Sequence, residues 1–160
     1  MHLIVTDNVE NRTDEVLDFL RGPRLWIPQT DYPDFDDWSL RVHQELKAQK
    51  KLAVVALERG SVVGSVIYQR HKQLGTALEI KNISVRPDYR GRHLASFLLR
   101  NAEVIGSAAL GTQVILADAK VRNRGIRMFL LGHHYRVLAQ SRDLYGLGAG
   151  QDVVYTKAVA

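Results

Sequence analysis

Apolar residues recur along the chain with two different spacings, and these divide it into helical and extended segments. Residues 13–20 and 38–49 carry apolar side chains at intervals of three and four, which predicts two amphipathic helices. Residues 52–57 and 61–68 are rich in β-branched side chains and flank the turn sequence Glu58-Arg59-Gly60. These two runs predict an antiparallel hairpin.

The strand predicted next along the chain changes its apolar face part-way. Leu78 and Ile80 share one face of an extended backbone, whereas Ile83 and Val85 have the opposite parity. One extra residue, a β-bulge near positions 81–82, brings both pairs to the core side of a sheet. Because bulges re-aim backbone groups beside active sites, this strand is a first candidate for a functional site.

The second half of the chain predicts a crossover between parallel strands. A helical apolar stripe that ends near Gly106 lies between extended runs at 77–85 and 114–117, and a second helix is expected at 123–131. A strand–helix–strand order of this kind favours a right-handed crossover. We therefore expect an α/β fold in a single domain, residues 1–160: a mixed, mostly antiparallel twisted sheet flanked by helices, with a central parallel β-α-β unit. Further strands are expected at residues 3–5, 135–138 and 153–156.

Composition narrows the function classes. The chain has no cysteine, which excludes disulfides, thiolate metal sites and a cysteine nucleophile, and the adjacent pair His133-His134 is too isolated for a metal site. No apolar run approaches the roughly 20 residues of a membrane span, so we expect a soluble, cytoplasmic protein without a membrane partner. The net charge of +5 favours anionic partners. The basic residues are spread along the chain, which argues against nucleic acid.

A short basic turn follows the bulged strand, and a helix begins directly after it. The turn reads Arg90-Gly91-Arg92-His93-Leu94-Ala95, with Val85-Arg86-Pro87-Asp88-Tyr89 before it. Unpaired N–H groups and the positive end of the helix dipole meet at such a helix start, and both suit phosphate. Taken alone, the turn also fits an arginine-rich helix start that only faces solvent.

The turn and its flanking segments resemble the GNAT superfamily of N-acetyltransferases. The family motif at this place is Gln/Arg-x-x-Gly-x-Gly/Ala; Arg90 and Ala95 fit it, whereas His93 stands where the family usually has glycine. We expect His93 to lie in the first helical turn, where a non-glycine residue needs no unusual backbone angles. Asn123 matches the asparagine that opens the helix flanking the pantetheine arm of the cofactor. Leu130 occupies the position of the family's frequent tyrosine acid.

This resemblance implies transfer of an acetyl group from acetyl-CoA to a primary amine, by direct attack in a ternary complex. CoA is then the product, and no metal takes part. The phosphates are expected on the N–H groups of residues 92–96, and the pantetheine arm along the strand edge at 83–85. The residues expected to bind the cofactor are Ile83, Ser84, Val85, Arg90, Gly91, Arg92, His93, Leu94, Ala95, Ser96 and Asn123.

Attack by the amine requires its neutral form, and the pKa of a primary amine is about 10, so a general base is expected. Glu79 lies eleven positions before Arg90, a spacing that resembles the general-base glutamate of the histone-acetylating branch. The competing interpretation is a solvent-facing strand glutamate paired with Lys81 or Lys72, with water as the base. The candidates for the general acid are Tyr145, Tyr135 and His134, with Tyr145 as the first choice and water as a competitor.

Two other functions fit the same residues. A non-catalytic CoA-binding sensor or scaffold is favoured by Leu130 and His93, and the sequence pI of about 9.6 motivates acetylation of an amine carried on RNA. Residues 26–38, rich in acidic and aromatic side chains, lie where the family has its variable acceptor-binding loops, so the resemblance implies a loop that contacts the acceptor. A packed loop whose acidic side chains face solvent fits the same residues. The identity of the acceptor and the acyl preference stay open, and the C-terminal strands are a candidate homodimer interface.

Overall fold

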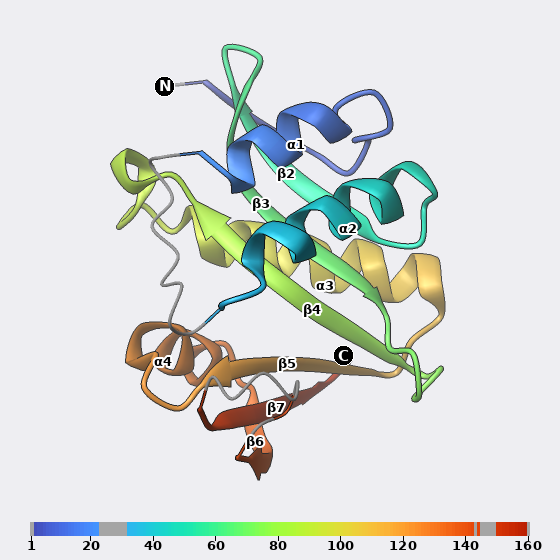
Figure 1. Ribbon diagram of the computed structural model, residues 1–160, viewed down its shortest axis with the longest axis vertical. Coiled ribbons are helices and arrows are strands. Elements are labelled where there is room, and N and C mark those ends of the chain that lie inside the picture. Colours follow the sequence, from blue (N-terminus) through green and yellow to red (C-terminus); the bar gives the residue numbers. More distant parts are fainter. Residues whose placement is uncertain (1, 23–31, 143, 145–149, 160) are drawn as a thin grey trace.

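A seven-stranded sheet lies between two layers of helices in the computed structural model (Figure 1), which describes residues 2–22, 32–142, 144 and 150–159. The strand order is β1-β2-β3-β4-β5-β7-β6, and the pair β4–β5 is parallel while the other pairs are antiparallel. This mixed, mostly antiparallel sheet confirms the predicted fold class. In chain order the elements are β1 (Leu3–Thr6), α1 (Thr13–Leu20), α2 (Phe35–Lys47), β2 (Leu52–Glu58), β3 (Ser61–Arg70), β4 (Ala77–Val85), the 3-10 helix η1 (Pro87–Tyr89), α3 (Leu94–Leu110), β5 (Val114–Lys120), α4 (Arg124–Gly132), β6 (Arg136–Ser141) and β7 (Asp152–Ala158).

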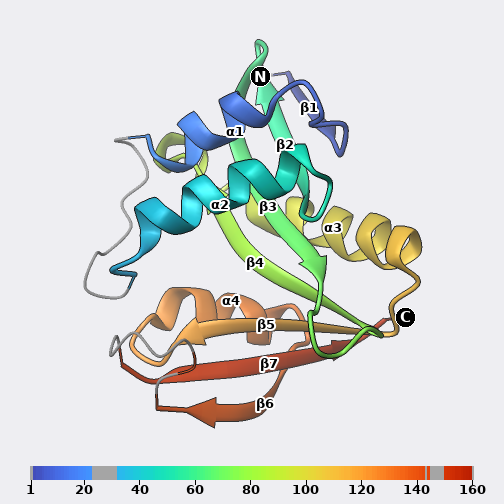
Figure 2. The same ribbon diagram turned by 45° about the vertical axis from the view of Figure 1, so that its right-hand side comes forward.

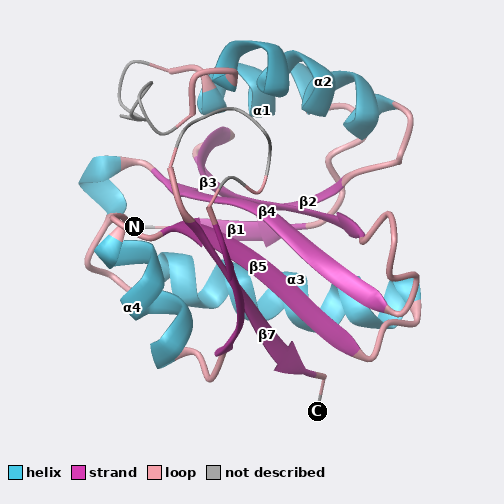
Figure 3. Ribbon diagram, turned by 60° about the horizontal axis from the view of Figure 1, so that its bottom comes forward, coloured by secondary structure: helices cyan, strands magenta, loops and turns pink. Residues whose placement is uncertain are grey.

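Each face of the sheet is covered by its own pair of helices. Helices α1 and α2 lie on one face, and α3 and α4 lie on the other (Figure 3). Alternating residues of β2 pack against the two helix layers. Val55 lies in the core under α1 and α2, whereas Val54 lies in the core under α3. This explains why β2 and the middle of β3 carry apolar residues on both of their faces. No helix in the described part of the chain is long and apolar enough to cross a membrane.

The hairpin between β2 and β3 is confirmed. Arg59 and Gly60 form its two-residue connection, and their φ angles are 50° and 79°. Two successive residues with positive φ are the requirement of a type I′ turn, whose twist matches that of the two strands.

The bulge in β4 is also confirmed. Ile67 of β3 pairs with Asn82, and Tyr68 pairs with Ile80, so Lys81 is the extra residue of β4. Val85 is consequently buried in the same core as Ile80, although the two have opposite parity. The bulge therefore keeps both halves of β4 facing α3.

Strands β4 and β5 pair over only part of their length. The parallel register runs from Ala77 and Val114 to Ile80 and Ala117, and it ends where the bulge begins. Beyond that point β4 pairs with β3, and the end of β5 pairs with β7. Figure 2 shows the two strands diverging toward their C-terminal ends. The backbone edge of residues 83–85 therefore has no parallel partner among the described strands.

Helix α3 is longer than predicted. It continues past Gly106 to Leu110 and ends at Gly111, whose φ is 61°. A Cβ at position 106 would lie 2.7 Å from Cε2 of Tyr68, so glycine here permits a close approach of the helix to β3. Gly106 is therefore a packing residue in the helix rather than a stop signal.

Candidate active site

The basic turn lies at the C-terminal end of β4. After Val85 the chain forms η1, and Tyr89 of η1 is buried. Arg90 then returns toward the strand, because its Nε donates to the carbonyl oxygen of Val85 at 2.9 Å. Gly91 follows with a φ of 72°. These contacts fix the direction in which the chain enters α3.

The position of His93 corrects the expectation from sequence. It does not lie in the first helical turn; it is the N-cap of α3, with φ 60° and ψ 12°. This left-handed conformation costs about 1–2 kcal/mol for a residue with a Cβ, and glycine escapes that cost. The turn therefore needs the backbone conformation that favours glycine, and the chain adopts it with histidine.

The start of α3 presents several backbone donors together. The first bond from the helix runs from the N–H of Phe97 to the carbonyl oxygen of His93 at 3.0 Å. The N–H groups of residues 94–96 precede it and so have no acceptor within the helix. His93 makes no side-chain hydrogen bond that caps this helix. The sequence-predicted residues of the turn therefore lie together in an arrangement suited to an anion.

Asn123 lies at the same edge of the sheet as the basic turn. It follows the C-terminal end of β5, which is parallel to β4, and ligands of open α/β sheets bind beyond the carboxyl ends of such strands. Its side-chain oxygen accepts from the N–H of Ile126 at 3.3 Å, which caps α4. A contact not expected from sequence adjoins the turn: Ser96 Oγ lies 2.9 Å from Nε2 of His133.

Glu79 is held by two neighbours on its own sheet. One carboxylate oxygen accepts from Gln69 Nε2 at 2.8 Å, and the other accepts from Lys81 Nζ at 3.0 Å. Burial raises the pKa of Glu79, but the charge of Lys81 and the two hydrogen bonds outweigh it and hold the pKa below 4.5. Glu79 is therefore ionised at neutral pH. Of the two lysines named in the competing interpretation, Lys81 is its partner, but the Glu79 side chain is only 15% exposed and does not face solvent.

The candidates for the general acid fall in different places. Tyr145 lies outside the described residues. Tyr135 is 2% exposed and donates to Glu103 of α3 at 2.8 Å, and burial together with that carboxylate raises its pKa. The phenol therefore keeps its proton, which it donates in the hydrogen bond to Glu103. His134 is exposed, with a φ of 68°. Leu130 is fully buried and packs in the core.

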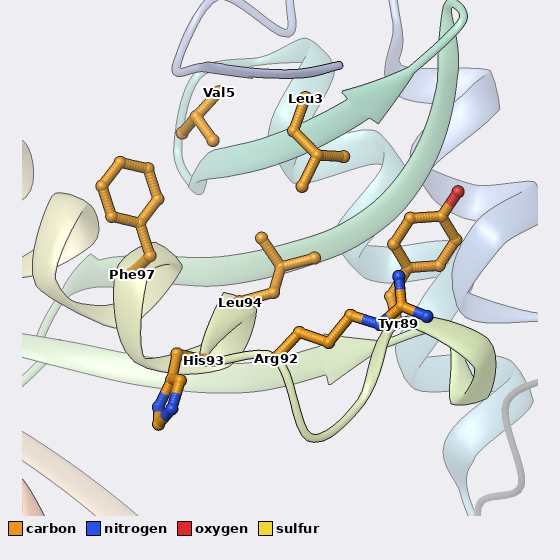
Figure 4. Close-up of a pocket in the computed structure, with 7 residues that line it drawn as sticks. All are labelled: Leu3, Val5, Tyr89, Arg92, His93, Leu94 and Phe97. Atoms are coloured by element: carbon orange, nitrogen blue, oxygen red, sulfur yellow. The ribbon is translucent and has the colours of Figure 1, made fainter. Parts of the chain in front are cut away.

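A shallow hollow of 330 Å³ lies between β1 and the start of α3 (Figure 4). Phe97 and the side chains of β1 form its apolar walls, and the Arg92 side chain extends toward Tyr89 at one end. The ring of His93 points away from it. The hollow thus shares the turn with the uncapped helix start but opens beside β1. Its lining residues are Leu3, Val5, Tyr89, Arg92, His93, Leu94 and Phe97.

Comparison with protein families gives a match over most of the chain. The model of the acetyltransferase (GNAT) family matches residues 14–133. This span contains the bulged strand, the basic turn and α4. A comparison with curated protein sequences finds no match.

Solved structures of the same family share the fold. A GNAT-family protein from Desulfovibrio desulfuricans matches with a TM-score of 0.81 and 16% identity, over 99% of this chain and 100% of that one. An aminoglycoside 6′-N-acetyltransferase complexed with coenzyme A matches with a TM-score of 0.77 and 16% identity, over 98% and 97%. The ribosomal-protein-S18-alanine N-acetyltransferase of Escherichia coli matches with a TM-score of 0.72 and 12% identity, over 99% and 95%. At these identities the likeness concerns the fold.

Proposed function

The chain belongs to the GNAT family of acetyltransferases, and from this premise we propose that it transfers an acetyl group from acetyl-CoA to a primary amine by direct attack in a ternary complex. One observation carries the proposal. A helix start without a side-chain cap, flanked by two arginines, lies beyond the end of a strand that has separated from its parallel neighbour. The coenzyme A bound to a structural neighbour supports the same cofactor here.

The residues present fit both the diphosphate and the pantetheine arm of such a cofactor. The N–H groups of residues 94–96 suit the diphosphate, and Arg90 and Arg92 add positive charge beside them. The edge of residues 83–85 can pair with the amides of the pantetheine arm, and Asn123 follows the C-terminal end of the neighbouring strand β5. Acetyl-CoA supplies the activated thioester when bound.

The reaction requires a residue of this chain, or a water that it binds, to remove a proton from the acceptor amine. We propose Glu79 for this task, directly or through one water, because it is ionised at neutral pH and lies on the strand that leads to the turn. Tyr145 stays the proposed acid for the departing thiolate, and its placement is outside the described residues. The acceptors of the two named structural neighbours differ, so the acceptor of this chain is open.

Binding of the cofactor gives the direct test. Acetyl-CoA at about 100 times its dissociation constant adds about 2.7 kcal/mol to the free energy of unfolding. For a chain of this length that corresponds to a rise in Tm of roughly 5–10 °C, measurable by differential scanning fluorimetry. If neither acetyl-CoA nor CoA binds at millimolar concentration in calorimetry, the proposal is wrong.

Removing the two arginines of the turn should weaken the binding of CoA. We expect the double substitution Arg90→Ala and Arg92→Ala to raise the Kd by about 30-fold, because each guanidinium supplies a charged partner for phosphate. The matched control is Arg21→Ala with Arg41→Ala. It removes the same charge from residues that pair with Asp36 and Asp34 on the helices of the other face. An equal loss in both double variants would mean that only overall charge matters.

A second function has a specific observation in its favour. Leu130, at the position of the family's tyrosine acid, is 1% exposed and part of the core. This favours a CoA-binding sensor without turnover. The two functions separate when thioester consumption is followed over a broad amine panel: tight CoA binding with no transfer to any amine supports the sensor.

A further inference from the structure

Two side chains from different helices meet beside the basic turn. The hydroxyl of Ser96, in the first turn of α3, lies 2.9 Å from Nε2 of His133, which follows the last residue of α4. The ring of His133 packs against Phe129, with 4.5 Å between ring centroids. The two residues are 37 positions apart in sequence, so the contact is not a local property of either helix.

Charged groups from neighbouring elements act on the His133 ring. Burial lowers its pKa; Lys157 of β7 and His134 act in the same direction, and Glu103 of α3 acts against them. The ring is therefore neutral at pH 7 and carries one donor nitrogen and one acceptor nitrogen. Nε2 faces Ser96, and the tautomer decides whether this nitrogen donates to the hydroxyl or accepts from it.

We propose that His133 is a positioning residue for the phosphates of the cofactor and acts through Ser96; the inference rests on the proposed CoA site. When Nε2–H donates to Oγ, the hydroxyl proton of Ser96 is directed away from His133 and toward the helix start. Ser96 then offers its backbone N–H and its hydroxyl to the same anion. In this tautomer His133, at the C-terminal end of α4, sets the orientation of the second donor.

The protonation of His133 is coupled to the anion in this arrangement. Phosphate favours the charged imidazolium, so bound CoA raises the pKa of His133. By linkage, CoA affinity increases as the pH falls through the titration of this ring. The phosphates of CoA titrate in the same range, so the effect is measured as a difference between wild type and a variant without the imidazole.

The experiment is calorimetric titration of the full chain with CoA. His133→Leu removes the hydrogen bond and keeps an apolar contact for Phe129, whereas His133→Gln keeps a donor at the same reach. We expect His133→Leu to raise the Kd about 5-fold and His133→Gln to stay within about 2-fold of wild type. Adding His133→Leu to Ser96→Ala should change nothing further, because the pair acts as one unit. Between about pH 7.5 and about pH 5.5, wild type should gain about 3-fold in affinity relative to His133→Gln.

The matched control is His43→Leu. His43 also joins two helices through Nε2, which lies 2.6 Å from Asp14 Oδ1, but it lies on α2 on the other face of the sheet. Its loss should leave CoA affinity unchanged. If wild type binds CoA and His133→Leu matches it, or if the losses from Ser96→Ala and His133→Leu add, the positioning role is refuted while the proposed function stands. If wild type does not bind CoA, the proposed function itself fails.

Discussion

Replacing Asp152 by alanine is expected to lower the free energy of unfolding by about 3–5 kcal/mol. Asp152 begins β7 and is 1% exposed, and its carboxylate lies 3.0 Å from Nζ of Lys120 at the end of β5. Lys120 is itself 3% exposed. Removal of the carboxylate leaves a buried ammonium without its counter-charge, which is far less favourable than an unpaired charge in water. Urea unfolding followed by circular dichroism measures the loss.

The same carboxylate also accepts a hydrogen bond from outside the sheet. Asp152 Oδ2 accepts from the N–H of Leu144 at 3.2 Å, so the pair joins β5, β7 and Leu144. The double substitution Lys120→Met with Asp152→Leu removes both charges and should recover most of the stability. Glu15→Ala in the exposed pair with Arg12 is the matched control, with an expected change below about 1 kcal/mol. A loss from Asp152→Ala as small as that control would show that water reaches the pair.

Glu79→Gln is expected to lower kcat/KM for an amine acceptor by about 100-fold at neutral pH. Glutamine can still accept a hydrogen bond from Lys81 or Gln69, so the fold should persist, but it cannot take a proton from the acceptor. Steady-state kinetics with an acceptor taken from the amine panel gives the measurement. If stability falls while kcat/KM is unchanged, Glu79 is part of an ion pair and not the base.

The pH dependence of stability follows from the direction of the Glu79 shift. Its pKa in the folded chain lies below its usual value, so its ionised form stabilises the fold above the pKa of the unfolded chain. That contribution is lost as the pH falls through the lower, folded value. The difference in unfolding free energy between wild type and Glu79→Gln should therefore be largest near neutral pH and vanish in strong acid.

Substitution of Lys81 gives an independent way to change the pKa of Glu79. Removing its charge by Lys81→Met leaves burial as the main influence, so the pKa of Glu79 should rise. If Glu79 is the base, the acidic limb of the kcat/KM profile moves to higher pH with it. Lys72→Met removes an equal charge that does not contact Glu79 and should leave the limb in place. An unmoved limb in Lys81→Met would assign the acidic limb to another group.

The parts of the fold that follow from short-range patterns could be predicted. The parity change in β4 predicted a bulge because the side-chain period of a strand is two, and the register places the extra residue at Lys81. The helix after the basic turn could be predicted because its apolar residues recur with helical spacing. The pairing of Glu79 with Lys81 was foreseen as one of two alternatives, since the sequence does not distinguish a solvent-facing pair from a base.

The failures involve contacts that only the tertiary structure reveals. Gly106 was interpreted as a helix end, but its neighbour is Tyr68 on a strand almost forty residues earlier, and no local pattern encodes that approach. The left-handed conformation of His93 comes from the way Arg90 and η1 direct the chain. The hydrogen bond between Ser96 and His133 joins α3 to the end of α4, and the sequence does not specify how these two helices are placed relative to each other.

The strand order has a consequence for synthesis on the ribosome. Strand β7 is made after β6 but lies between β5 and β6, and β6 pairs with no other described strand. Until residues 152–158 have emerged, β6 lacks its partner and the apolar edge of β5 is uncovered. A nascent chain that stalls before this point carries an open strand edge, the feature that favours aggregation. Of the described strands, the one translated last is thus the one that completes the sheet.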